Sequence, residues 1–154
     1  MKLRVHEIQD AGTVDESVVL APDLISLGNP PDCPILDGPV EAEIHAEALD
    51  GEILALVKVR ARVRLSCSRC LEGFQTPLSE SFEMHVSLKE VFLDVLEDVR
   101  EAFLLALPVK PLCGAQCRGL CPRCGNNLNQ TSCGCSKEQK DTLFSKLKGF
   151  QKRD

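Results

Sequence analysis

The stretch "VEAEIHAEALDGEILALVKVRARVRL" (residues 40–65) contains two runs in which apolar and polar side chains alternate, one on each side of Asp50-Gly51. Alternation with a period of two is typical of a β-strand that buries one of its faces. An Asp-Gly dipeptide between such runs favours the two-residue turn of a β-hairpin. The stretch therefore predicts two long antiparallel strands joined by a tight turn.

The turn also fixes the expected register of the hairpin. It sets apolar residues opposite apolar residues on one face and glutamates opposite basic residues on the other, so both faces are matched. Arg62 and Arg64 have no acidic residue opposite them in this register. The expected pairs are Ala48 with Ile53, Ile44 with Val57, Glu43 with Lys58 and Glu41 with Arg60.

The segments around the hairpin complete the expected fold. Residues 82–88 alternate again, which extends the hairpin to an antiparallel meander over residues 40–88. Residues 94–107 change to helical spacing, whereas the prolines and glycines of residues 22–39 indicate a loop. The first 28 residues give no clear period beyond loose alternation at the start. We expect an α+β fold with an antiparallel, barrel-like sheet and one packed helix.

Length and composition are those of a soluble globular domain, with 154 residues of which 44% are hydrophobic and 27% charged. No apolar run approaches the ~18 residues that cross a bilayer. The beginning, "MKLRVHEIQDAG", lacks the apolar core of a secretory signal. We therefore expect a cytoplasmic protein without membrane contact, and in that reducing compartment clustered cysteines are metal ligands or redox centres.

Six of the nine cysteines lie in "CGAQCRGLCPRCGNNLNQTSCGC" (residues 113–135). The central "CPRCG" is typical of one half of a zinc-ribbon site, and a structural Zn²⁺ takes four such ligands in a closed tetrahedron. The first choice is Cys121, Cys124, Cys133 and Cys135. In one alternative, Cys113 and Cys117 replace Cys133 and Cys135. In another, each of these two pairs supplies one ligand.

The cysteines admit three other interpretations. The spacing Cys117-x3-Cys121-x2-Cys124 is that of the iron-sulfur site in radical enzymes that use S-adenosylmethionine, but the 30 residues after Cys124 are too few for their barrel. A thiol redox relay is disfavoured because neither Cys-x-x-Cys pair begins a helix after a parallel strand. A zinc-ribbon regulator would bind specific duplex DNA.

The remaining cysteines and the polar residues indicate no chemistry of their own. Cys67 and Cys70 in "CSRCLEGF" are expected to be a reduced pair that ends a hairpin, in preference to ligands of a second metal ion, and Cys33 a lone structural thiol. No nucleophile with a base, phosphate loop or pair of carboxylates stands out, so no catalytic residue, enzymatic activity or small-molecule substrate is predicted.

Charge is divided along the chain, since residues 1–109 carry −11 and residues 110–154 carry +6. A basic end attracts phosphate, giving affinity without base readout, although a solvated tail or a protein partner is an equal alternative. The chain has no Trp or Tyr on which bases would stack. The candidate RNA or partner contacts are Arg62, Arg64, Arg69, Arg118, Arg123, Lys137 and Lys140.

Three ordered motifs, "CSRCLEGF" (67–74), "LLALPVKPLC" (104–113) and "CRGLCPRCGNNLN" followed by "CGC" (117–135), resemble the YceD-like family of large ribosomal RNA subunit accumulation proteins. The resemblance implies a noncatalytic role in large-subunit ribosomal RNA accumulation or processing in bacteria and plastids. Ribosomal RNA, its precursor or ribosomal assembly proteins would be the partners. The expected organisation is an α+β domain (1–109), a zinc-ribbon-like segment (110–136) and a basic tail (137–154).

Overall fold

A five-stranded antiparallel sheet forms the body of the protein, which is described by a computed structural model over residues 2–28 and 34–135 of the chain. Its central strand, β5 (Glu52–Ser66), is bonded along its whole length to β6 (Gly73–Ser87). The other edge of β5 pairs first with β4 and then with β3, and β2 lies outside β4. These three strands are β2 (Thr13–Leu20), β3 (Ile35–Leu36) and β4 (Val40–Leu49).

The expected hairpin register is confirmed at every pair that the sequence predicted. Ala48 faces Ile53, and Glu43 faces Lys58, across the turn at residues 50–51. The Arg60 guanidinium lies 3.3 Å from the carboxylate of Glu43, which is a diagonal neighbour rather than the directly opposite residue. The third strand is longer than expected, because β6 already begins at Gly73.

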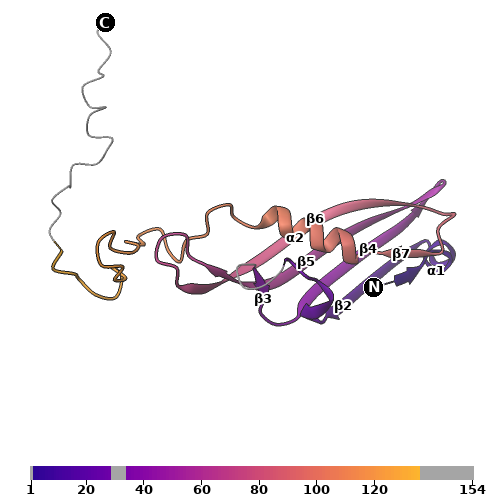
Figure 1. Cartoon of the computed structure of the whole chain (residues 1–154). Coiled ribbons are helices and arrows are strands. Elements are labelled where there is room, and N and C mark those ends of the chain that lie inside the picture. The colour runs from indigo at the N-terminus through magenta and orange to yellow at the C-terminus, as the bar shows by residue number, and fades with distance from the viewer. Residues whose placement is uncertain (1, 29–33, 136–154) are drawn as a thin grey trace, which may run out of the picture.

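The alternation along β5 separates the core from the solvent. Every odd-numbered residue from Ile53 to Leu65 is buried, and most of the even-numbered ones from Lys58 onward are charged and exposed. Helix α2 (Leu96–Ala106) covers the sheet and brings Val99 and Phe103 into the core, both fully buried (Figure 1). The helix expected over residues 94–107 is thus confirmed.

Two features differ from the expected fold. The amino-terminal region, for which no clear period was found, contains β1 (Lys2–Arg4), helix α1 (Val5–Ala11) and β2. Helix α1 has only seven residues and buries two of them, so its helical period is too short to detect. Among the described residues the edge strands β2 and β6 do not pair, so the sheet is open rather than barrel-like.

Two small elements complete the described chain. A single 3₁₀ turn, η1 (Pro22–Leu24), follows β2, and β7 (Phe92–Asp94) pairs with β1 in a separate two-stranded sheet. The cysteine segment lies at the end of the molecule opposite α1, beyond the β5–β6 turn (Figure 1). No helix in the described ranges is long and apolar enough to cross a membrane. The expected basic tail at 137–154 lies outside them.

Two residues of α2 provide a direct test of this packing. Phe103 is fully buried beneath the helix, whereas Leu105 is 88% exposed. We expect Phe103→Ala to lower the free energy of unfolding by about 3–5 kcal/mol, because it removes buried apolar surface and leaves a cavity. Leu105→Ala should change it by less than about 0.5 kcal/mol. Urea denaturation measures both, and equal effects would contradict the placement of α2.

Candidate metal centres

Eight cysteines of the described chain form two groups of four. Within each group the four sulfur atoms all lie within 4.8 Å of one another. We call Cys67, Cys70, Cys113 and Cys117 the inner cluster, and Cys121, Cys124, Cys133 and Cys135 the outer cluster. The outer cluster contains the four cysteines that the sequence analysis chose first as zinc ligands. Cys67 and Cys70, which were expected to end a hairpin without further partners, lie instead with Cys113 and Cys117. The ninth, Cys33, lies outside the described residues.

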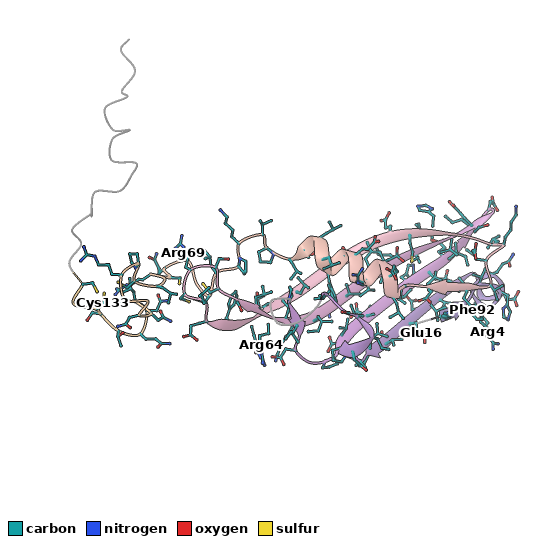
Figure 2. All side chains as sticks on the ribbon, viewed as in Figure 1. Arg4, Glu16, Arg64, Arg69, Phe92 and Cys133 are labelled. Atoms are coloured by element: carbon teal, nitrogen blue, oxygen red, sulfur yellow. The ribbon has the colours of Figure 1, made fainter. Side chains whose placement is uncertain are left out.

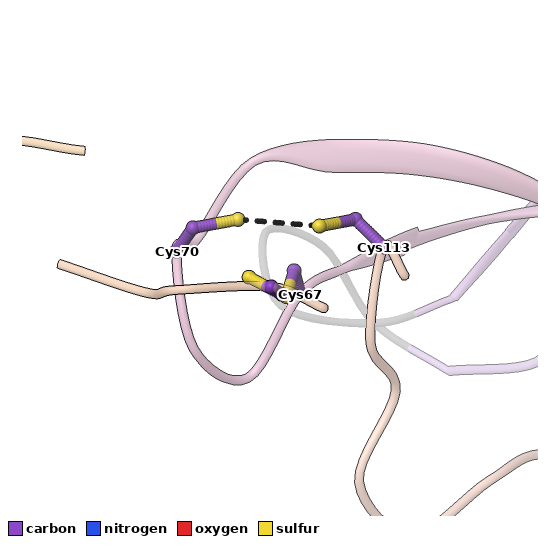
Figure 3. A group of neighbouring side chains, drawn as sticks. Cys67, Cys70 and Cys113 are labelled. Atoms are coloured by element: carbon purple, nitrogen blue, oxygen red, sulfur yellow. Dashed lines mark hydrogen bonds between the residues drawn. The ribbon is translucent and has the colours of Figure 1, made fainter. Parts of the chain in front are cut away.

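The inner cluster has the spacing of ligands around a single ion. The Cys67 and Cys117 sulfurs are 3.7 Å apart. Those of Cys70 and Cys113, joined by the dashed line in Figure 3, are 3.6 Å apart. An ion bonded to four sulfurs at about 2.3 Å in a regular tetrahedron holds the sulfurs about 3.8 Å apart. Both distances are too long for a disulfide, and the cysteines are free thiols. An iron-sulfur cubane, with one thiolate on each of four irons, would separate the sulfurs more widely.

Strand β5 places the first sulfur of the inner cluster. Cys67 follows the buried odd-numbered residues of β5 in the same alternation and is fully buried itself. The turn after it brings Cys70 back toward the sheet. The chain after α2 then passes over this turn, where the Pro111 carbonyl accepts a hydrogen bond from the Ser68 amide at 2.8 Å. Cys113, two residues later, thereby reaches the sulfur of Cys70.

The same backbone turn occurs in both clusters. In the first turn, the Leu71 amide donates to the Cys67 carbonyl and the Cys67 amide to the Glu72 carbonyl, each at 2.9 Å. The second turn repeats this pattern, with Gly125 bonded to Cys121 at 2.9 Å and Cys121 to Asn126 at 2.8 Å. Leu71 and Gly125 hold matching left-handed positions, with φ of 61° and 72°. Each turn therefore presents two sulfurs and inward-facing amides, as zinc-binding turns do.

Hydrogen bonds shift the pKa values of the inner thiols in opposite directions. Backbone amides donate to the Cys67 sulfur, first that of Cys113, and lower the pKa of Cys67 to about 6 against the effect of burial. The amide side chain of Asn129 lowers the pKa of Cys117. Hydrogen bonds with Cys117 and Cys70 instead raise the pKa of Cys113 to about 12. A divalent cation would favour all four thiolates at once.

The outer thiols show the same division. The backbone amide of Cys124, followed by that of Arg123, lowers the pKa of Cys121 to about 6. The contact with Cys124 and burial raise the pKa of Cys135 to about 12. One thiol of each cluster therefore ionises readily, and another resists while its neighbours carry the charge.

An amide network that the sequence analysis did not identify ties the two clusters together. The Asn129 amide group donates to the Cys117 sulfur at 3.3 Å, and its oxygen accepts from the Arg118 amide at 2.7 Å. Asn127 in turn connects Asn129 to Glu72, which also accepts from Gln130 at 3.1 Å. The only signal in the sequence was the run of asparagines after "CPRCG", whose partners lie in a turn 55 residues earlier.

The candidate arginines have different environments. The Arg69 guanidinium donates to the Cys117 carbonyl at 3.0 Å, so it holds the inner cluster together. Arg64, expected to be unpaired, lies 3.0 Å from the Asp37 carboxylate, because the loop before β4 folds back over β5.

Arg62 and Arg118 are exposed, and no side-chain partner engages them within the described ranges. Arg123 is also exposed. In Figure 2, Arg64 lies on the sheet and Arg69 lies near the cysteines. Lys137 and Lys140 lie outside the described residues.

The comparison with known families agrees with the three sequence motifs. Residues 56–151, from the middle of β5 through the cysteine segment, match the family described as "Large ribosomal RNA subunit accumulation protein YceD". The chain belongs to the YceD family. This name describes an accumulation factor rather than an enzyme. No solved structure matches the chain.

Individual relatives of this YceD protein match over segments of 55 to 125 residues. The "Large ribosomal RNA subunit accumulation protein YCED homolog 1, chloroplastic" of Arabidopsis thaliana is 33% identical over 55 residues, which are 36% of this chain and 17% of that protein. Its namesake in Zea mays is 34% identical over 69 residues, or 45% and 24%. An uncharacterized protein of Mycobacterium tuberculosis is 27% identical over 125 residues, or 70% and 60%. The chain therefore spans less than two thirds of each of these relatives.

Gly119 tests the contact between the two turns. Its φ is 74°, and an added Cβ would lie 3.0 Å from the Arg69 carbonyl oxygen. We expect Gly119→Ala to destabilise this contact by more than the about 1–2 kcal/mol that a left-handed backbone costs an L-residue. Gly125→Ala, with φ of 72° in open space, should cost only the backbone part, and Gly114→Ala almost nothing.

Hydrogen exchange of one amide measures these differences. The Leu120 amide donates to the Arg69 carbonyl at 3.1 Å, so its exchange reports local opening of the contact. We expect the Leu120 amide to exchange most slowly in Gly114→Ala, faster in Gly125→Ala and fastest in Gly119→Ala. Equal exchange in the first and last variants would show that the close approach does not restrain the segment.

Proposed function

We propose that this YceD protein is a noncatalytic factor of the bacterial cytoplasm that supports accumulation of large-subunit ribosomal RNA during ribosome assembly. The family match over residues 56–151 carries this proposal. The matched segment contains most of β5, all of β6 and α2, and both cysteine clusters, so the family resemblance and the candidate site coincide in the same part of the molecule.

The proposed contact is with RNA phosphates, through exposed arginines at the cysteine end of the molecule. Arg62 lies on the polar face of β5 beside a hollow of about 520 Å³ that Arg60 and the acidic residues Asp37 and Glu41 also line. Arg118 lies between the two clusters. Guanidinium groups without acidic partners bind phosphate oxygens in a bidentate manner and give affinity without sequence readout. A ribosomal assembly protein is the alternative partner.

The outer cluster is proposed to hold a structural Zn²⁺ in a zinc-ribbon-like segment. Its four sulfurs lie within 4.8 Å of one another, and four thiolates leave a tetrahedral ion no open position. Such an ion would stabilise the segment at residues 110–136, between the α+β domain at 1–109 and the basic tail at 137–154. Bound iron with visible absorbance would instead support the iron-sulfur alternative.

Replacement of the chromosomal gene tests the function. Loss of the gene should lower mature large-subunit RNA relative to small-subunit RNA, and the Arg62→Ala, Arg118→Ala double variant should restore that ratio only in part. The matched control is Arg4→Ala with Lys89→Ala, which removes the same charge at the end of the sheet away from Cys67, since Arg4 ends β1 and Lys89 follows the end of β6 that pairs with Glu52. The RNA ratio is read from total RNA at equal protein abundance. An unchanged ratio after gene loss would contradict the proposed function.

The nature of the contact is tested separately with the purified full chain. If phosphates are bound, log affinity for structured large-subunit RNA falls linearly with log salt, and the double variant should reduce the slope by about one to two contacts. The control variant should keep the slope. Protein crosslinks to an assembly factor, together with an RNA affinity that the arginine changes do not alter, would favour the protein partner.

A further inference from the structure

The inner cluster joins two parts of the chain that are distant in sequence. Cys67 and Cys70 come from the turn between β5 and β6, and Cys113 and Cys117 from the segment that follows α2. The two sulfur pairs that meet are separated by 50 and 43 residues. The outer cluster, by contrast, takes all four cysteines from 15 consecutive residues, 121–135.

We propose that the inner cluster is a second structural zinc site, which fastens the cysteine segment to the end of the sheet. With the outer cluster filled as well, the protein would bind two zinc ions. This inference does not depend on any RNA contact, and it assigns Cys67 and Cys70 a role that their place at a hairpin turn did not indicate.

The sulfur geometry supports this proposal. The sulfur pairs Cys67–Cys117 and Cys70–Cys113, at 3.7 Å and 3.6 Å, agree with the about 3.8 Å edge of a tetrahedral zinc-thiolate site. Hydrogen bonds to the sulfurs orient them and stabilise their negative charge, as the hydrogen-bonding groups around metal ligands do. The Arg69 amide donates to Cys67 at 3.5 Å, and the Asn129 side chain donates to Cys117 at 3.3 Å.

Burial also argues for an ion. Cys67, Cys70 and Cys117 are 0%, 4% and 8% exposed, whereas Cys113 is exposed. In the described part of the chain, three partly buried apolar residues pack against the buried ones, namely Phe74, Leu112 and Leu120. A core of this size is too small to order a segment of some 25 residues alone, and small folds of this kind usually depend on metal ions or disulfides. Disulfides are absent among the described cysteines, which leaves the ion.

The surrounding contacts show what the ion would hold in place. The Ser68 amide donates to Pro111, the Leu120 amide to Arg69, and the Arg69 guanidinium to Cys117. All three hydrogen bonds connect the β5–β6 turn to the cysteine segment. An ion bonded to both sides would therefore keep these bonds closed, and through residues 118–120 it would fix the outer cluster relative to the sheet.

Metal analysis of the purified full-length chain tests the inference. The wild-type protein should contain two zinc ions per chain. The outer double variant, Cys121→Ser with Cys124→Ser, should contain one, and so should the inner double variant, Cys67→Ser with Cys70→Ser. Ser68→Ala, an exposed change within the same inner turn, is the control and should keep both. One zinc per chain in both the wild type and the inner variant would overturn the proposal.

Two further measurements keep the test decisive if the inner variant fails to fold. Cobalt titration of metal-free wild-type protein should develop the visible bands of tetrahedral cobalt thiolate up to two equivalents, and an end point at one equivalent would overturn the proposal. Hydrogen exchange of Leu120 should remain slow in the outer variant, in which the inner ion is retained. Fast exchange of this amide in that variant would show that the inner cluster does not hold the segment.

Discussion

The odd-numbered face of β5 is the constraint on which the rest of the structure depends. Its buried residues run from Ile53 to Leu65, and the same alternation continues to Cys67, so one strand defines both the core and the position of the first sulfur. A register shift of one residue would expose the core and turn Cys67 away from the other three cysteines. The cysteine segment is therefore positioned by the same pattern that closes the sheet against α2.

This dependence explains which features the sequence could predict. The hairpin register and α2 follow from local periods and an Asp-Gly turn, and the structure confirms them. Helix α1 and β2 were not predicted, since the first is too short and the second is a largely exposed edge strand with a weak alternation. Mixed local signals of this kind are settled only by packing against the completed sheet.

The cysteines show the same limit. The outer cluster is contained in one short segment, so its grouping could be suggested from spacing alone. The partners of Cys67 and Cys70 are decided by where the chain goes after α2, and no local pattern contains that information. The pairing of Arg64 with Asp37 was missed for the same reason, because the loop that carries Asp37 returns to β5 only in the folded protein.

The charges of the clusters alter the meaning of the basic residues near them. With a divalent ion in each cluster, eight thiolates leave four negative charges, which equals the number of positive side chains on Arg69, Lys110, Arg118 and Arg123. The cysteine segment would then be close to neutral. Without metal it would be more positive, although Cys67 and Cys121, whose pKa values are lowered to about 6, would still carry negative charge. Nonspecific attraction to RNA would therefore be weaker in the metal-bound protein than in the metal-free one. Phosphate contact in the metal-bound protein would rely on individual guanidinium groups that form no ion pair. Arg62, which lies on β5 away from the sulfurs, is such a group, although Asp37 and Glu41 line the hollow beside it.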